Sequence, residues 1–289
     1  IMLCGDITHR KDLMNKYAVE NNKYNYRSWF RQVKPLFFQT DFVVGSLRSF
    51  FPGREFMNRY QNSAPDEYLG ELSYTGFNVL LMGNTAALTD RESLNFKTLK
   101  KLNFFEIQNA GYYRDSLQKA ESYPLVLEKK DIRVAFLNYS LDSTLLILPN
   151  HSINFFHADS IRRDIIQCRK KMLADYVIAY IDWAGQDSFK LGRVAELLNM
   201  GIDIIIGTGS GEAFTSSDLL SYSDGSLKLH VDNIGFFNAH SNERDRDKTA
   251  IVEVVLKKNK SSKQVSLHDM GFIPLWTLID NERYHVLPI

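Results

Sequence analysis

The chain has 289 residues, of which 44% are hydrophobic and 24% are charged, and its formal net charge at pH 7 is +1. These values are ordinary for a globular protein with a sizeable core, and the near-neutral charge gives no indication of a nucleic-acid-binding or membrane-surface protein. No apolar run of about 18 residues occurs, which excludes a membrane-spanning helix. Two cysteines, Cys4 and Cys168, exclude a disulfide framework. Because the sequence opens at Ile1, inside an apolar run and without an initiator Met, we expect that an N-terminal segment has been removed.

Apolar runs bounded by turn residues alternate with segments of helical period along most of the chain. In the first part we expect strands at 1–4, 42–44, 79–82 and 104–107, and helices at 26–36, 68–74 and 93–102. Further on we expect strands at 125–127, 134–137, 176–181, 202–206, 228–231, 235–237 and 251–256, and helices at 160–173, 191–199 and 213–220.

Strands that are apolar throughout and separated by helices indicate a sheet covered on both faces. The strand-only run in the last third indicates a second sheet packed on the first. The sequence therefore predicts an α/β sandwich. No repeat and no long linker divides it, so we predict a single domain over 1–289 with a C-terminal β extension at about 264–289.

Polar loops, most of them with glycine, follow six of the apolar strands, at 5–10, 45–51, 83–90, 138–142, 182–187 and 207–212. In sandwiches of this kind, functional residues gather on loops at the carboxyl ends of strands.

In order, these segments resemble the signature segments of the CapA family. Residues 3–6 (LCGD) resemble its opening "GD", residues 41–48 (DFVVGSLR) its "aDlviGNLE", and residues 76–86 (GFNVLLMGNTA) its "GFDvlvtANNH". Residues 123–129 and 132–139 together are similar to "YPlileknGirIAlLnYt", residues 180–185 (YIDWAG) stand in the place of "HWGxEY", and residues 201–207 (GIDIIIG) match "GaDvViG". The tail segment 271–276 (GFIPLW) is similar to "GyiPtWv".

CapA is the capsule-synthesis, poly-γ-glutamate-biosynthesis branch of the calcineurin-like metallophosphoesterases. The resemblance implies a four-layer αββα sandwich of metallophosphoesterase type with a metal-bearing cleft at its strand ends. It also implies association with the export or assembly of an anionic capsule polymer in the bacterial envelope.

The metal-ligand pattern of that superfamily is largely missing from this sequence. A metallophosphoesterase site needs carboxylates, imidazoles and an amide around its cations. Asp6 keeps the first carboxylate and Asn84 the amide, while Arg48 stands where the family has Glu. The four expected imidazole positions carry other residues, namely Thr85 or Ala86, Asp182, Gly209 and Gly211, and Asp187 lies near the family's following Glu.

A fixed guanidinium at Arg48 disfavours a divalent cation at the same place. We expect no cofactor, and we expect Arg48 to pair with the strand-end carboxylates as a salt-bridged polar floor. The alternative is a single divalent cation held by Asp6, Asp182 and Asp187. His9 and His240 are histidines whose loops could reach the same place, although a lone loop histidine is more often a surface or hydrogen-bonded residue.

The interpretation that follows is a non-catalytic CapA-like scaffold or binding module in a bacterial capsule or envelope pathway. Its predicted partners are other envelope proteins or an anionic polymer, and its predicted location is the cell envelope or periplasm. The predicted ligand-binding cleft consists of Asp6, Ser46, Arg48, Asn84, Asp182, Asp187 and Ser210.

Two other functions remain open. One is a hydrolase or poly-γ-glutamate-handling enzyme with a rebuilt single-metal or metal-free site, in which Asp6 and Asp187 serve as acid and base with His240 or His9 assisting. The other is a binding protein that holds an anionic fragment, such as a γ-glutamyl carboxylate, against Arg48 and the backbone amides of 207–211.

Overall fold

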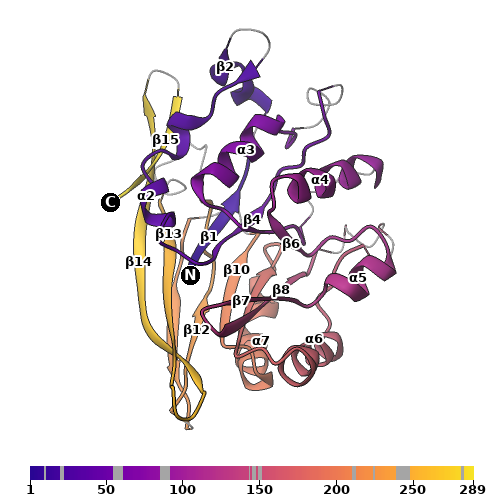
Figure 1. The fold of residues 1–289 in the computed structure, drawn as a ribbon, viewed down its shortest axis with the longest axis vertical. Helices are drawn as coiled ribbons and strands as arrows, with labels where there is room; N and C mark the ends of the chain where they lie inside the picture. The colour runs from indigo at the N-terminus through magenta and orange to yellow at the C-terminus, as the bar shows by residue number, and fades with distance from the viewer. Residues whose placement is uncertain are drawn as a thin grey trace.

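A computed structural model describes residues 1–9, 11–19, 23–54, 61–84, 92–142, 144, 148, 152–209, 213–223, 225–238, 248–280 and 283–289. Two large β-sheets and their covering helices make up most of these residues (Figure 1).

The first sheet has seven strands in the order β15-β14-β13-β1-β4-β5-β6. Its strands are β1 (Met2–Ile7), β4 (Val43–Leu47), β5 (Val79–Leu81), β6 (Gln108–Ala110), β13 (Lys248–Lys258), β14 (Val265–Asp280) and β15 (Arg283–Pro288). The elements outside it are η1 (Lys11–Tyr17), the small pair β2 (Ala18–Val19) and β3 (Lys23–Tyr24), and the helices α1 (Arg27–Phe30), α2 (Lys34–Phe37), α3 (Asp66–Thr75) and α4 (Glu92–Phe104). The strands β1, β4, β5 and β6 are parallel, and β13 joins β1 antiparallel.

The second sheet has six strands in the order β11-β12-β10-β9-β8-β7. Its strands are β7 (Leu125–Lys129), β8 (Ile132–Ser140), β9 (Tyr176–Asp182), β10 (Ile204–Thr208), β11 (Ser217–Ser221) and β12 (Leu227–Val231). Its helices are α5 (Ser116–Ser122), α6 (Ala158–Ile166), which continues into the π-helical turn η5 (Gln167–Lys171), and α7 (Asp187–Met200).

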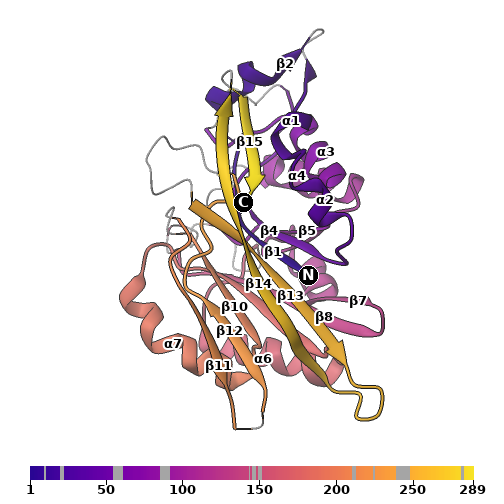
Figure 2. The same ribbon diagram turned by 90° about the vertical axis from the view of Figure 1, so that its left-hand side faces the viewer.

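The two sheets pack face to face, with α1 to α4 outside the first and α6 and α7 outside the second (Figure 2). Side chains alternate between two hydrophobic cores, as a strand covered on both faces requires. In β1, Met2 and Cys4 join the core under α1 to α4, whereas Leu3 joins the core shared with the second sheet. The predicted four-layer αββα sandwich is therefore confirmed.

Several local predictions are wrong. The predicted strand 104–107 is the end of α4 and the turn after it, and the chain first becomes extended at β6. The predicted helix 213–220 overlaps the strand β11 (Ser217–Ser221) instead. Residues 235–237 form no strand but cross the end of β1, through a bridge between Asp6 and Phe236.

The predicted helix 26–36 divides into α1 and α2. Pro35 lies in the first turn of α2, where its missing N–H has no cost. Inside one continuous helix the same proline would remove a hydrogen bond and clash with the preceding turn, so the helix restarts.

Among the described residues, no helix combines the length and the apolar character needed to cross a membrane.

Candidate functional site

Polar residues from both sheets meet where β1, β4, β9 and β10 end. We call Asp6, Arg48, Asp182 and Gly209 the strand-end cluster. Asp6 lies in β1 and Asp182 ends β9, while Arg48 and Gly209 directly follow β4 and β10. The Gly209 N–H lies 3.4 Å from Asp6 Oδ2, so the cluster joins the two sheets. The fold thus places together three charged residues that are far apart in the sequence.

Asp6 and Arg48 form an ion pair, with 3.0 Å between Arg48 Nη1 and Asp6 Oδ2. The side chains are only 3% and 15% exposed, respectively. Burial lowers the pKa of Arg48, but the negative charges of Asp6 and Asp182 outweigh this effect and raise it. The predicted ion pair is confirmed. The second oxygen, Asp6 Oδ1, is buried and has no hydrogen-bond partner among the described residues.

Asp182 is the second carboxylate of the cluster and is 2% exposed. Its Oδ1 accepts a hydrogen bond from the Ala184 N–H at 3.1 Å, and its Oδ2 accepts one from Ser140 Oγ at 3.3 Å. Burial raises the pKa of Asp182 to about 6, with Arg48 opposing the shift and Asp6 adding to it. Asp182 therefore changes charge nearer to neutral pH than an ordinary aspartate does.

Replacing Asp182 with Asn should remove a pH dependence of stability. The folded-state pKa of about 6 lies above the ordinary value of 3.8. Between these values the folded protein holds a proton that the unfolded chain has released, so this group lowers the free energy of unfolding as pH rises through that window. We expect Asp182→Asn to be more stable than the natural protein above pH 6, by about 3 kcal/mol, and the difference to shrink towards pH 4. Urea denaturation at several pH values measures it.

The control is Asp269→Asn, on an exposed position of β14, which should leave the pH profile unchanged. Parallel pH profiles for Asp182→Asn and the natural protein would contradict the assignment.

Gly209 has no room for a side chain. It adopts φ +92°, and a Cβ built on it would lie 1.7 Å from Asp182 Oδ1. Asp182 therefore occupies the space that a side chain at position 209 would need. The aspartate at 182 and the glycine at 209, which were expected to stand in place of two family histidines, are thus sterically coupled.

Ser46 and Asn84 lie beside the cluster. Ser46 is the register partner of Asp6 on β4 and is buried. The Asn84 side chain donates from Nδ2 to the Leu47 carbonyl oxygen at 3.0 Å, which fixes the loop after β5 against the end of β4. The side chain of Asp187 and all of Ser210 and His240 lie outside the described residues, so their membership of the predicted cleft stays a prediction.

Sequence reasoning did not single out Asn138, which connects the two sheets near the cluster. Its Oδ1 accepts a hydrogen bond from the Gly83 N–H at 2.6 Å, and its Nδ2 donates to the Tyr180 carbonyl oxygen at 3.3 Å. A Cβ on Gly83 or Gly111 would collide with this amide. The available sequence signal for this contact was the presence of glycine after two strands, Gly83 after β5 and Gly111 after β6, where a polar side chain can approach the backbone.

His9 lies fully buried, with its ring against residues at the start of α1 and in α3. Its Nε2 is 2.8 Å from Tyr26 Oη and its Nδ1 is 3.2 Å from the Ser63 carbonyl oxygen. The rings of Trp29 and Tyr68 also contact it. His9 is therefore a hydrogen-bonded core residue, which is the more common role of a lone loop histidine, and its assisting role in catalysis stays a prediction.

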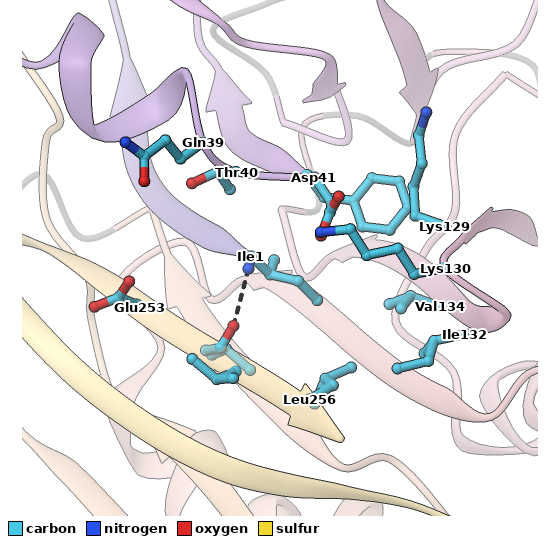
Figure 3. Close-up of a pocket in the computed structure, with 13 residues that line it drawn as sticks. Ile1, Gln39, Thr40, Asp41, Lys129, Lys130, Ile132, Val134, Glu253 and Leu256 are labelled. Carbon is cyan, nitrogen blue, oxygen red and sulfur yellow. Dashed lines mark hydrogen bonds and ion pairs between the residues drawn. The ribbon is translucent and has the colours of Figure 1, made fainter. Parts of the chain in front are cut away.

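A separate pocket lies at the opposite ends of the strands, around Ile1, Phe42 and Leu256 (Figure 3). Ile1 directly precedes β1 and is five residues before Asp6, which in an extended chain separates the two residues by about 16 Å. At its rim, Lys130 Nζ pairs with Asp41 Oδ2 at 3.0 Å. The pocket contains none of the predicted site residues, so the strand-end cluster remains the candidate site.

Comparisons with known proteins identify the chain's relatives. The family model described as bacterial capsule synthesis protein PGA_cap matches residues 1–213. A crystal structure of a hypothetical protein from Thermus thermophilus is similar over 100% of this chain and 97% of that chain, with 13% identity and a TM-score of 0.49. No curated protein matches the chain.

The described residues of the cluster do not fit the pair of cations that the metallophosphoesterase fold implies. Such sites hold two ions about 3.5–4 Å apart among several anionic or neutral donors. Here the guanidinium of Arg48 occupies one oxygen of Asp6, and its positive charge repels a second cation nearby.

Proposed function

We propose, from the premise that the chain belongs to the bacterial capsule synthesis protein family PGA_cap, that it serves capsule synthesis as a non-catalytic binding or scaffold protein of the cell envelope. The observation that carries this proposal is the buried ion pair of Arg48 with Asp6. A salt-bridged carboxylate is a poor metal ligand and a poor base, because its charge is already neutralised.

The charges of the cluster favour a protein partner over an anionic polymer at this place. Among the described residues of the cluster, two carboxylates, Asp6 and Asp182, share one positively charged neighbour, Arg48. With both carboxylates ionised, their sum is negative, which repels a polyanion. The proposed partners are therefore other envelope proteins, and an anionic capsule polymer would have to bind elsewhere.

Phosphodiesterase and phosphatase assays test the absence of catalysis. With Mn²⁺, Mg²⁺ or Zn²⁺ added, the natural protein and Asp6→Ala should show the same background hydrolysis of bis-p-nitrophenyl phosphate. Elemental analysis of the purified protein should find no stoichiometric metal. Turnover that disappears in Asp6→Ala would refute the proposal.

One observation favours the alternative of a metal-free hydrolase. The pKa of Asp182, raised to about 6 by burial, lies close to the range in which a carboxyl group can act as general acid or base at neutral pH. Such an enzyme would cleave poly-γ-glutamate or a related amide with a rate that changes near pH 6. Loss of that inflection in Asp182→Asn would establish the alternative, whereas the absence of cleavage products leaves the binding function.

A further inference from the structure

Strand β11 is an edge strand of the six-stranded sheet. It is the last strand in the sheet order and, within the described part of the chain, pairs only with β12 (Figure 2). Its sequence is Ser-Asp-Leu-Leu-Ser, and the side chains of Leu219 and Leu220 are 48% and 38% exposed. An edge strand with exposed leucines is a template for pairing with a further strand.

The hydrogen bonds of β12 show which backbone groups of β11 point outward. The Leu229 N–H donates to the Asp203 carbonyl oxygen on the β10 side, so Lys228 and His230 face β11. Their register partners, Leu220 and Asp218, therefore use their backbone groups on β12.

The alternate residues Ser217, Leu219 and Ser221 point their N–H and C=O groups away from the sheet. No described residue donates to or accepts from these groups. β11 thus presents three residues whose backbone hydrogen-bonding groups are not used by the described chain.

The edge strand β15 of the seven-stranded sheet differs from β11 in how its outward-pointing backbone groups are used. There the Ile289 N–H donates to Pro274 O, so Tyr284, Val286 and Pro288 point outward. Tyr17 Oη accepts from the Tyr284 N–H at 2.7 Å, and Pro288 has no N–H. Two of these three positions are therefore blocked, Tyr284 by a side chain and Pro288 by its missing N–H, which are common ways to protect an edge strand. Over the residues that the structure describes, β11 has neither device.

We propose that β11 pairs antiparallel with β11 of a second copy of this chain, centred on Leu219. This register sets Leu219 opposite Leu219, Ser217 opposite Ser221, and Asp218 opposite Leu220. Every outward-pointing residue then meets an outward-pointing residue of the second copy, so all of their N–H and C=O groups are paired. No like charges meet, because Asp218 faces a leucine.

The pair joins the six-stranded sheets of two copies into one continuous sheet across a twofold axis. The exposed Leu219 side chains pack on each other at the centre. This dimer is independent of the proposed function, because β11 contains no residue of the strand-end cluster.

Two lysine variants at adjacent positions test this register. Leu219→Lys places two ammonium groups opposite each other on the twofold axis and removes the central apolar contact, so it should weaken dimerisation by about tenfold or more. Leu220→Lys places its ammonium group opposite Asp218 of the second copy, so it should leave dimerisation unchanged or strengthen it. Sedimentation velocity over a wide range of protein concentration measures both.

Both positions are exposed, so both variants should fold, and circular dichroism melting verifies this. If the natural chain is monomeric at every concentration, the proposal is wrong, and a strand of another protein becomes the partner of β11. If both variants weaken dimerisation equally, the proposed register is also wrong, because pairing centred on Leu219 predicts a different effect for each variant.

Discussion

Replacing Arg48 with Met should lower the free energy of unfolding by about 3–5 kcal/mol, the usual cost of removing one partner of a buried ion pair. Asp6 is 3% exposed, and among the described residues Arg48 is the only cation bonded to it. Methionine keeps most of the side-chain volume but leaves the carboxylate without a counter-charge, close to Asp182. Urea denaturation at pH 7 measures the loss.

Two controls separate the charge effect from a packing effect. In the double variant Asp6→Asn with Arg48→Met, the partner carboxylate is removed together with its counter-charge, and Asp182 loses the unfavourable charge of Asp6 along with the favourable charge of Arg48, so most of the stability should return. Arg133→Met removes an exposed ion pair with Glu128, whose atoms are 2.7 Å apart, and should cost at most about 1 kcal/mol. If Arg48→Met costs no more than Arg133→Met, the ion pair does not hold the cluster together.

Replacing Gly209 with Ala should cost about 3 kcal/mol or more, because the new methyl group meets both a steric and a conformational obstacle. The Cβ would lie 1.7 Å from Asp182 Oδ1, and the residue has φ +92°. Either Asp182 leaves its hydrogen bonds with Ala184 and Ser140, or the backbone after β10 moves. Chemical denaturation again gives the magnitude.

Gly185 offers a matched comparison, because its φ is +73° but none of the described residues lies within 4 Å of a Cβ there. Gly185→Ala should therefore show the conformational cost alone, about 1–2 kcal/mol. Adding Asp182→Ala to Gly209→Ala should recover the steric part. A Gly209→Ala variant as stable as Gly185→Ala would show that Asp182 does not fill this space.

The strands of the double sheet were predictable because their apolar runs are continuous. Residues 176–181 and 202–206 were expected as buried strands, and they form β9 and most of β10. Such runs fit only a sheet covered on both faces, so sequence and tertiary context agree. The polar ends of these strands then indicated where Asp6 and Asp182 would meet.

The elements that failed lacked such agreement. β11 has two adjacent leucines between polar residues, which match neither a helical nor an alternating pattern, and its pairing with β12 decides its conformation. Phe104 suggested a strand, yet it is 79% exposed at the end of α4, and the chain reverses at Glu106 with φ 56°. An exposed aromatic residue resembles a buried one when only the sequence is available.

The ion pair of the site could be predicted from the sequence, but its steric setting could not. Arg48 in place of an acid implied a counter-charge for Asp6, which is an argument about charge alone. The contact between Asp182 and Gly209 depends on atomic positions in two neighbouring parallel strands. Likewise, nothing in the sequence placed His9 among Tyr26, Trp29 and Tyr68.

The position of β1 in the seven-stranded sheet has a consequence for how the protein is made. Met2 pairs with Val43 on one side and with Glu253 on the other. During synthesis one edge of this apolar strand therefore stays unpaired until the ribosome has released residues 248–258. The strand that carries Asp6 is synthesised before every other strand of its sheet and is among the last to acquire both its neighbours, so one of its edges is open to pairing with other strands until the chain is nearly complete.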